Sequence, residues 1–145
     1  MSVVVPYHVQ PIAATANGIF AGLGLTLNGV TIPALRVGGY PVASWAVTYK
    51  NGSKIGIATI FISSAAHFYT YYLTKNRRAL YCGIASLISF PYTLIFMKPT
   101  NDRLHELNAN PAHDQKEVVG LVEKWDKLQM FRTGAGLAAL WLTLF

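Results

Sequence analysis

The sequence predicts an all-α integral membrane protein, an antiparallel bundle of four transmembrane helices with an extramembrane loop after the first helix. Charged residues make up only 12% of the 145 residues, whereas hydrophobic residues make up 52%; a soluble domain is about one-quarter charged. Uncharged runs long enough to cross a bilayer alternate with short basic stretches. The length allows a single domain, residues 1–145. Together these observations disfavour a soluble globular enzyme.

Each predicted span follows one uncharged run. No charged residue precedes Arg36, and the first run lacks the basic flank of a secretory signal, so it is interpreted as a retained span. Only residues 75–78 separate the second run from the third, which requires a tight antiparallel hairpin. The last run becomes long enough only if its helix begins near Lys116. The four spans are expected at about residues 9–30, 55–74, 79–97 and 116–145.

The segments between the spans are expected to be loops. Residues 31–53 contain prolines, glycines and aromatic side chains and are interpreted as an ordered, partly extended loop outside the membrane. Residues 101–115 are polar, include an Asn-Pro pair and are interpreted as a loop that leads into the fourth helix. In the first span, Ala14, Gly18 and Gly22 form a stripe of small residues that predicts close helix packing.

The distribution of charge indicates the orientation and the partners. The loops after the first and third spans hold most of the Lys and Arg residues, which places these loops in the cytoplasm and both termini across the membrane. We expect a multi-pass protein of an endomembrane, the endoplasmic reticulum or a vesicle. Basic residues scattered among short loops do not predict a nucleic-acid partner. The expected partners are the lipid bilayer and a hydrophobic small molecule, with a homo-oligomer left open.

Polar side chains inside the predicted spans are candidate functional residues, because placing them in lipid is costly. His67 is an imidazole well inside a span, where it suits either a general base or a hydrogen bond between helices. Arg132 lies at the start of the last apolar run and can reach the interface or pair inside the bundle with Asp126 or a ligand. Each span carries one polar stripe, which predicts a polar interior pocket. Further candidates on these stripes are Asn17, Tyr71, Trp125 and Gln129.

Neither a metal nor an organic cofactor is predicted. Cys82 is the single cysteine, which excludes an intrachain disulfide and a metal site built from several cysteines. The sequence has no phosphate-binding glycine loop, no His-Glu-x-x-His segment and no flavin or nicotinamide fingerprint.

Two segments carry a resemblance to a known family. Residues 97–104 (MKPTNDRL) and 125–132 (WDKLQMFR) resemble the signature of the anthrone oxygenase-like family, small integral membrane proteins of fungal aromatic polyketide pathways. Residues 17–22 (NGIFAG), and Trp45 with Tyr49, also fit, so the resemblance runs along nearly the whole chain. Gln129 departs from the family pattern, which commonly has Asn or His at that position.

The resemblance implies an oxygenase that converts an anthrone to an anthraquinone with molecular oxygen as co-substrate. Such a site needs a base, a donor for the developing oxyanion and a flat apolar slot. His67 is the expected base, with Asp126 next; Arg132 and Asn101 are the expected donors, and Trp125 a wall of the slot. Two alternatives remain open: a membrane cyclase or isomerase that acts without oxygen, and a non-catalytic membrane scaffold or carrier.

Overall fold

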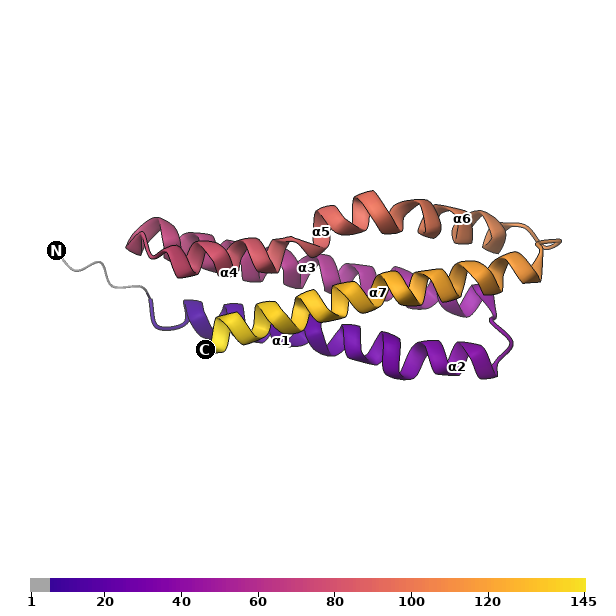
Figure 1. The fold of residues 1–145 in the computed structure, drawn as a ribbon, viewed down its shortest axis with the longest axis horizontal. Helices are drawn as coiled ribbons and strands as arrows, with labels where there is room; N and C mark the ends of the chain where they lie inside the picture. Colours follow the sequence, from indigo (N-terminus) through magenta and orange to yellow (C-terminus); the bar gives the residue numbers. More distant parts are fainter. Residues whose placement is uncertain (1–5) are drawn as a thin grey trace.

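The computed structural model describes residues 6–145 as four long antiparallel helical rods in one elongated bundle (Figure 1). The first rod consists of α1 (Val9–Thr26), the π-helical turn η1 (Leu27–Thr31) and α2 (Ile32–Val37). The second is α3 (Val42–Thr74) and the fourth is α7 (Gln115–Leu144). The third consists of α4 (Arg77–Leu87), α5 (Ser89–Tyr92), the π-helical turn η2 (Thr93–Met97) and α6 (Lys98–Ala109). No β-strand occurs within residues 6–145, which confirms the all-α prediction.

Helix covers most of the two segments for which loops were expected, so that prediction is wrong. α3 begins at Val42 rather than near residue 55, and α6 continues to Ala109. A proline lies two residues after the end of each π-helical turn, Pro33 after η1 and Pro99 after η2. A proline inside a helix cannot donate to the carbonyl four residues earlier, and its ring crowds that carbonyl. That carbonyl lies inside the π-helical turn in both rods, where the wider turn accommodates the proline.

Short turns join the rods. Gly39 (φ 76°) and Tyr40 (φ 58°) adopt left-handed conformations between α2 and α3. The predicted hairpin at residues 75–78 is confirmed: Lys75 ends α3 with φ 55°, and the side chain of Asn76 accepts a hydrogen bond of 2.9 Å from the backbone N–H of Arg78. At the opposite end, the Asp114 carboxylate accepts a hydrogen bond of 2.9 Å from the Lys116 N–H and caps α7.

Close packing of α1 against α7 depends on two glycines other than those expected. A β-carbon on Gly24 would lie 2.7 Å from Thr133 Oγ1, and one on Gly136 would lie 2.7 Å from the Phe20 ring. These contacts bring α1 and α7 together. A β-carbon on Gly18 or Gly22 would meet no atom within 4 Å. The prediction that Gly18 and Gly22 allow close packing between helices is therefore wrong within this chain.

The third rod is broken where α4 meets α5, and its second half is offset from the first (Figure 1). Pro91 follows this break and cannot donate to the carbonyl of Leu87, the last residue of α4. The offset moves α5 and η2 away from the axis of α4. It leaves space beside α3 at the middle of the bundle.

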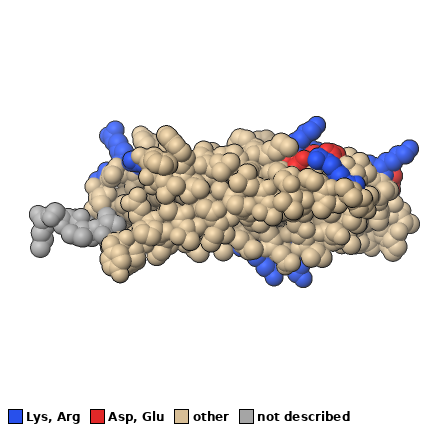
Figure 2. All heavy atoms as spheres, turned by 90° about the horizontal axis from the view of Figure 1, so that it is seen from below, with Lys and Arg blue, Asp and Glu red and all other residues tan. Residues whose placement is uncertain are grey.

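The two ends of the bundle differ in charge. On the face shown in Figure 2, acidic residues lie only toward the end formed by α2, α6 and the start of α7, and a band without charge separates them from basic residues at the other end. Two of the rods, Val9–Val37 and Arg77–Ala109, are long and apolar enough to cross a membrane. These two rods support an association with a membrane.

Candidate functional site

A cavity lies at the middle of the bundle, at the level of the two π-helical turns. The empty space, with the open solvent at its mouth included, has a volume of about 740 Å³. Its mouth lies between α3 and the α5–η2 segment, where Ile57 and Leu94 are exposed. The walls are mainly apolar and come from all four rods; they include Phe20, Leu23, Leu27, Ile60, Phe90 and Leu94. The polar lining comes from Thr48, Tyr49, Ser53, Thr93, Gln129 and Arg132.

Arg132 brings a positive charge into this mainly apolar cavity. Its Nη1 donates a hydrogen bond of 3.0 Å to Gln129 Oε1, and its guanidinium carbon lies 5.5 Å from the centre of the Phe20 ring. Its Nε is buried without a hydrogen-bond partner. Among residues 6–145, no carboxylate lies within ion-pair distance of Arg132. A cation in such surroundings favours an anionic or strongly polar ligand.

Two further hydrogen-bonding groups of the lining have unused capacity. The indole N–H of Trp125 is buried and has no partner. The Tyr49 hydroxyl accepts a hydrogen bond of 3.4 Å from Asn101 Nδ2 and donates to no residue that the structure describes. Buried polar groups are normally hydrogen-bonded. Trp125 and Arg132 each have one buried N–H without a partner and both line the cavity, which makes them the candidate donors to oxygen atoms of a ligand.

The predicted residues Trp125, Gln129 and Arg132 come together as expected. They lie on successive turns of α7 and face the bundle interior, and Trp125 packs edge-on against Trp45 with ring centres 6.2 Å apart. Asn101 lies beside the cavity through its contact with Tyr49, inside α6 rather than in the expected turn.

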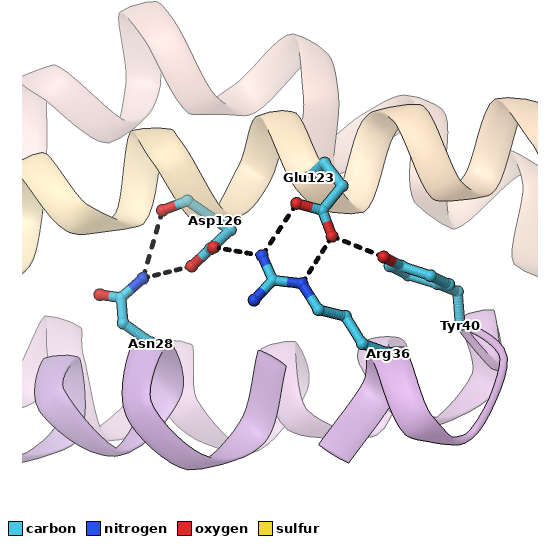
Figure 3. A network of polar contacts seen from close by, with 5 residues as sticks. All are labelled: Asn28, Arg36, Tyr40, Glu123 and Asp126. Atoms are coloured by element: carbon cyan, nitrogen blue, oxygen red, sulfur yellow. Dashed lines mark hydrogen bonds and ion pairs between the residues drawn. The ribbon is translucent and has the colours of Figure 1, made fainter. Parts of the chain in front are cut away.

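Asp126 faces away from the cavity, and its carboxylate is fully engaged (Figure 3). Asn28 Nδ2 donates a hydrogen bond of 2.6 Å to Asp126 Oδ1, and Arg36 Nη2 lies 2.9 Å from Asp126 Oδ2. Only 4% of the Asp126 side chain is exposed. Both carboxylate oxygens are therefore taken by groups outside the cavity. This placement argues against the predicted role of Asp126 as the second choice of base.

The same network continues along α7 to Glu123 and ties α2 to α7 (Figure 3). Arg36 makes two hydrogen bonds of 2.8 Å to the Glu123 carboxylate, and the Tyr40 hydroxyl donates one of 2.6 Å. The Arg36 guanidinium and the Tyr40 hydroxyl hold the pKa of Glu123 at about 2, below its ordinary value of 4.5. In return, the carboxylate raises the pKa of Tyr40. Because Asn28 belongs to η1, this clamp fixes η1 and α7 relative to each other.

His67 lies in a different cavity, toward the α3–α4 hairpin. That cavity has a volume of about 430 Å³ with its opening included and is lined also by Arg78, Cys82 and Thr143. His67 Nε2 lies 3.0 Å from Thr143 Oγ1, which donates to the Ala139 carbonyl. The contact fits the neutral tautomer that carries its proton on Nε2, with Thr143 Oγ1 as the acceptor.

The structure therefore divides the predicted pocket into two cavities. Asn17 belongs with His67, because its Nδ2 donates a hydrogen bond of 2.9 Å to Thr143 Oγ1. Tyr71 lines neither cavity and lies beside Lys75. Arg132 faces Gly56, and His67 follows Gly56 by eleven residues on α3, about 16 Å along the helix axis. His67 cannot reach a small ligand bound at Arg132 without a large rearrangement.

Comparison with known proteins gives the chain a family. The model of the anthrone oxygenase family matches residues 45–142. The chain belongs to the anthrone oxygenase family. It is also 30% identical over 129 residues to the anthrone oxygenase dmxR16 of Cryptosporiopsis sp. (strain 8999), a match that covers 83% of this chain and 75% of that protein. No solved structure matches. Membership supports an oxygenase-type enzyme with a role in polyketide pathways.

The part of this chain that matches the anthrone oxygenase family supplies most of the residues that line the cavity. It begins at Trp45 and includes the lining residues of α3, α5, η2 and α7. Tyr49 is one of the polar cavity residues that were not predicted as site residues from the sequence. The signal was present, because Tyr49, Gly52, Gly56 and Ile60 follow a spacing of three and four residues that continues the predicted second span backwards. Because residues 31–53 were expected to form a loop, Tyr49 was not assigned to this helix face.

Proposed function

We propose that this chain is a multi-pass membrane enzyme that oxidises an anthrone-type aromatic polyketide to an anthraquinone with molecular oxygen in the Arg132 cavity. Family membership supports the reaction class. The observation that carries the assignment to this cavity is the guanidinium of Arg132, which lies in mainly apolar surroundings and has no carboxylate partner within residues 6–145. The mainly apolar walls, which come from all four rods, suit a flat aromatic ring system.

The chemistry begins with loss of a proton from the methylene carbon between the two aromatic rings. The resulting anion carries its charge mainly on the carbonyl oxygen. Arg132 and Trp125 both line the cavity, and we assign their N–H groups to bind that oxygen. Preorganised donors at a developing oxyanion are a large catalytic contribution. We assign the methylene proton to water at the opening of the cavity, and the Tyr49 hydroxyl, which accepts a hydrogen bond from Asn101, to a further hydrogen bond with the oxyanion.

The anion then reduces oxygen itself. One electron passes from the anion to O₂, and the radical pair joins through a new C–O bond at the former methylene carbon. The peroxide takes a proton, and loss of water leaves the second carbonyl of the quinone. One anthrone and one O₂ give one anthraquinone and one water. In this scheme the electrons come from the substrate, so it requires neither a metal nor an organic cofactor.

The distribution of side chains supports a membrane location for this enzyme. On the half of the bundle near the hairpin, large apolar side chains are exposed on all four rods, among them Ile12, Phe61, Ile62, Ile84 and Trp141. The interior of the same half holds small polar residues, including Ser63, Ser64, Ser86 and Ser89. A soluble bundle has the opposite arrangement. We propose that all four rods cross an endomembrane and that the charged end projects into water.

The proposal is tested by the ratio of oxygen consumed to quinone formed. Purified protein in nanodiscs of neutral lipid is given an anthrone, and oxygen uptake and quinone formation are measured with spontaneous autoxidation subtracted. We expect one O₂ consumed for each quinone, with saturation by the anthrone. Turnover of the substrate without oxygen uptake would favour a cyclase or isomerase. Binding of the anthrone without turnover would favour a carrier. If the anthrone is neither bound nor turned over, the proposal is contradicted.

A further inference from the structure

A groove adjoins the cavity at its charged end. It runs between the first turns of α3 and the second half of α6 and has an open volume of about 990 Å³. Tyr49 and Ser53 line both the groove and the cavity, so the two spaces meet at these side chains. The aromatic rings of Trp45, Tyr49 and His105 stand at this junction, with the His105 centre 5.0 Å from each of the other two. The rest of the groove includes Ala46, Val47, Lys50, Lys54 and Asn108.

The groove carries a positive charge that nothing in the described chain compensates. Lys50 and Lys54 lie one turn apart on α3, and both are exposed. Neither is within ion-pair distance of a carboxylate of residues 6–145. The neighbouring acidic residues are already paired. Arg36 holds Glu123 and Asp126, Arg103 holds Glu106 and Glu117, and Lys98 holds Asp102.

We propose that the groove is a subsite for a carboxylate substituent of the substrate, so that the substrate class is an anthrone that carries an acidic group at one end. This inference rests on the proposed function. The fused rings occupy the apolar cavity, and the carboxylate extends past Tyr49 and Ser53 to Lys50 and Lys54. The two ends of the ligand then meet different chemistry: Arg132 binds the oxyanion that forms during the reaction, and the two lysines bind a charge that is present throughout.

Two probes of equal shape test the subsite. An anthraquinone carboxylate and the corresponding carboxamide are titrated against protein in phosphatidylcholine nanodiscs, and binding is followed by quenching of tryptophan fluorescence, since Trp45 and Trp125 flank the site. For the wild-type protein we expect the carboxylate to bind about tenfold more tightly at low salt, as two half-exposed charge pairs allow. The preference should decrease as salt is raised.

The matched variants are Lys50→Gln/Lys54→Gln and Lys124→Gln/Lys127→Gln. Both remove two positive charges, but Lys124 and Lys127 are exposed on α7 and line neither space. We expect the carboxylate preference to fall to about one in the first variant and to remain in the second. Equal loss in both variants, or an unchanged preference in the first, would overturn the inference and would leave Lys50 and Lys54 as contacts to lipid headgroups.

The two proposals fail in different ways. Wild-type protein that binds both probes with equal affinity contradicts the subsite and leaves the proposed function standing. Wild-type protein that binds neither probe contradicts the ligand class of the cavity, and the subsite with it.

Discussion

Gly56 of α3 faces Arg132 of α7 so closely that a β-carbon on the glycine would lie 3.5 Å from Nη2 of the guanidinium. That distance is an ordinary contact, so a small side chain fits there. The position therefore offers a way to neutralise the Arg132 charge without changing Arg132 itself.

Gly56→Asp should abolish turnover, because its carboxylate would pair with Arg132 and occupy the place of the substrate anion. Gly56→Asn has the same shape without the charge and should retain much more of the activity. Oxygen uptake with an anthrone compares the two variants. Equal activity of the Asp and Asn variants would show that the unpaired charge of Arg132 has no part in the reaction.

Arg132→Gln should lower kcat by about 10²–10³-fold, the effect of removing one stabilising group from an oxyanion site. Arg132→Lys should restore only part of the activity, because an ammonium does not reproduce the planar set of guanidinium donors. Single-turnover quinone formation measures the chemical step in both variants. A fully active Lys variant would mean that charge alone is sufficient, and a fully active Gln variant would remove Arg132 from the site.

His67→Ala should lower stability more than turnover. The variant removes the contact of 3.0 Å to Thr143 Oγ1, which still accepts a hydrogen bond from Asn17 Nδ2, so we expect a loss of about 0.5–1.5 kcal/mol, the net contribution of one hydrogen bond. The cavity at Arg132 is unaffected, so we expect turnover within about tenfold of the wild-type rate, less than the factor for a missing general base. Thermal unfolding in detergent and oxygen uptake are measured on the same sample. A folded variant without turnover would restore His67 as the base.

Glu123→Gln should flatten the dependence of stability on pH. Because the folded-state pKa of Glu123, about 2, lies below the ordinary 4.5, the ionised group stabilises the fold above about pH 4.5. That stabilisation is lost as pH falls through 4.5 toward 2. Melting temperatures between about pH 2 and pH 7 should converge for wild type and variant at the acidic end. Glu106→Gln, which removes an exposed carboxylate on α6, is the control. A constant difference across the range would contradict this account.

Gly24→Ala should destabilise the bundle, whereas Gly18→Ala should not. The added methyl group at Gly24 would meet the Thr133 backbone at 3.1 Å as well as its hydroxyl, and overpacking of this kind costs about 1–3 kcal/mol. Gly18 has open space around it, so alanine there gains up to about 1 kcal/mol of helix propensity. Thermal unfolding of the pair checks the contrast. A similar loss at Gly18 would indicate that its face packs against another copy of the chain.

The helical class, the hairpin and the α7 face with Trp125 and Arg132 could be predicted from the sequence, because hydrophobic runs and three-to-four spacing are local properties. The position of a residue along the bundle axis relative to residues of other helices is not a local property of the sequence. His67 and Arg132 lie on adjacent polar stripes, but the register between α3 and α7 depends on contacts such as Gly56 with Arg132. The helix through Pro33 was missed for a related reason, since proline ordinarily ends a helix unless the turn before it widens.

The two π-helical turns mark the places where the chain can lose a residue with little change to the rest of the bundle. Each holds one more residue than a regular turn, so deleting a residue within Leu27–Thr31 would leave a regular helix whose later residues keep nearly the same direction. Arg36 would still face Glu123 and Asp126, whereas a deletion in a regular part of the same rod would turn it by about 100°. Homologues one residue shorter across η1 or η2 can therefore be compared with this chain position by position on both sides of the gap.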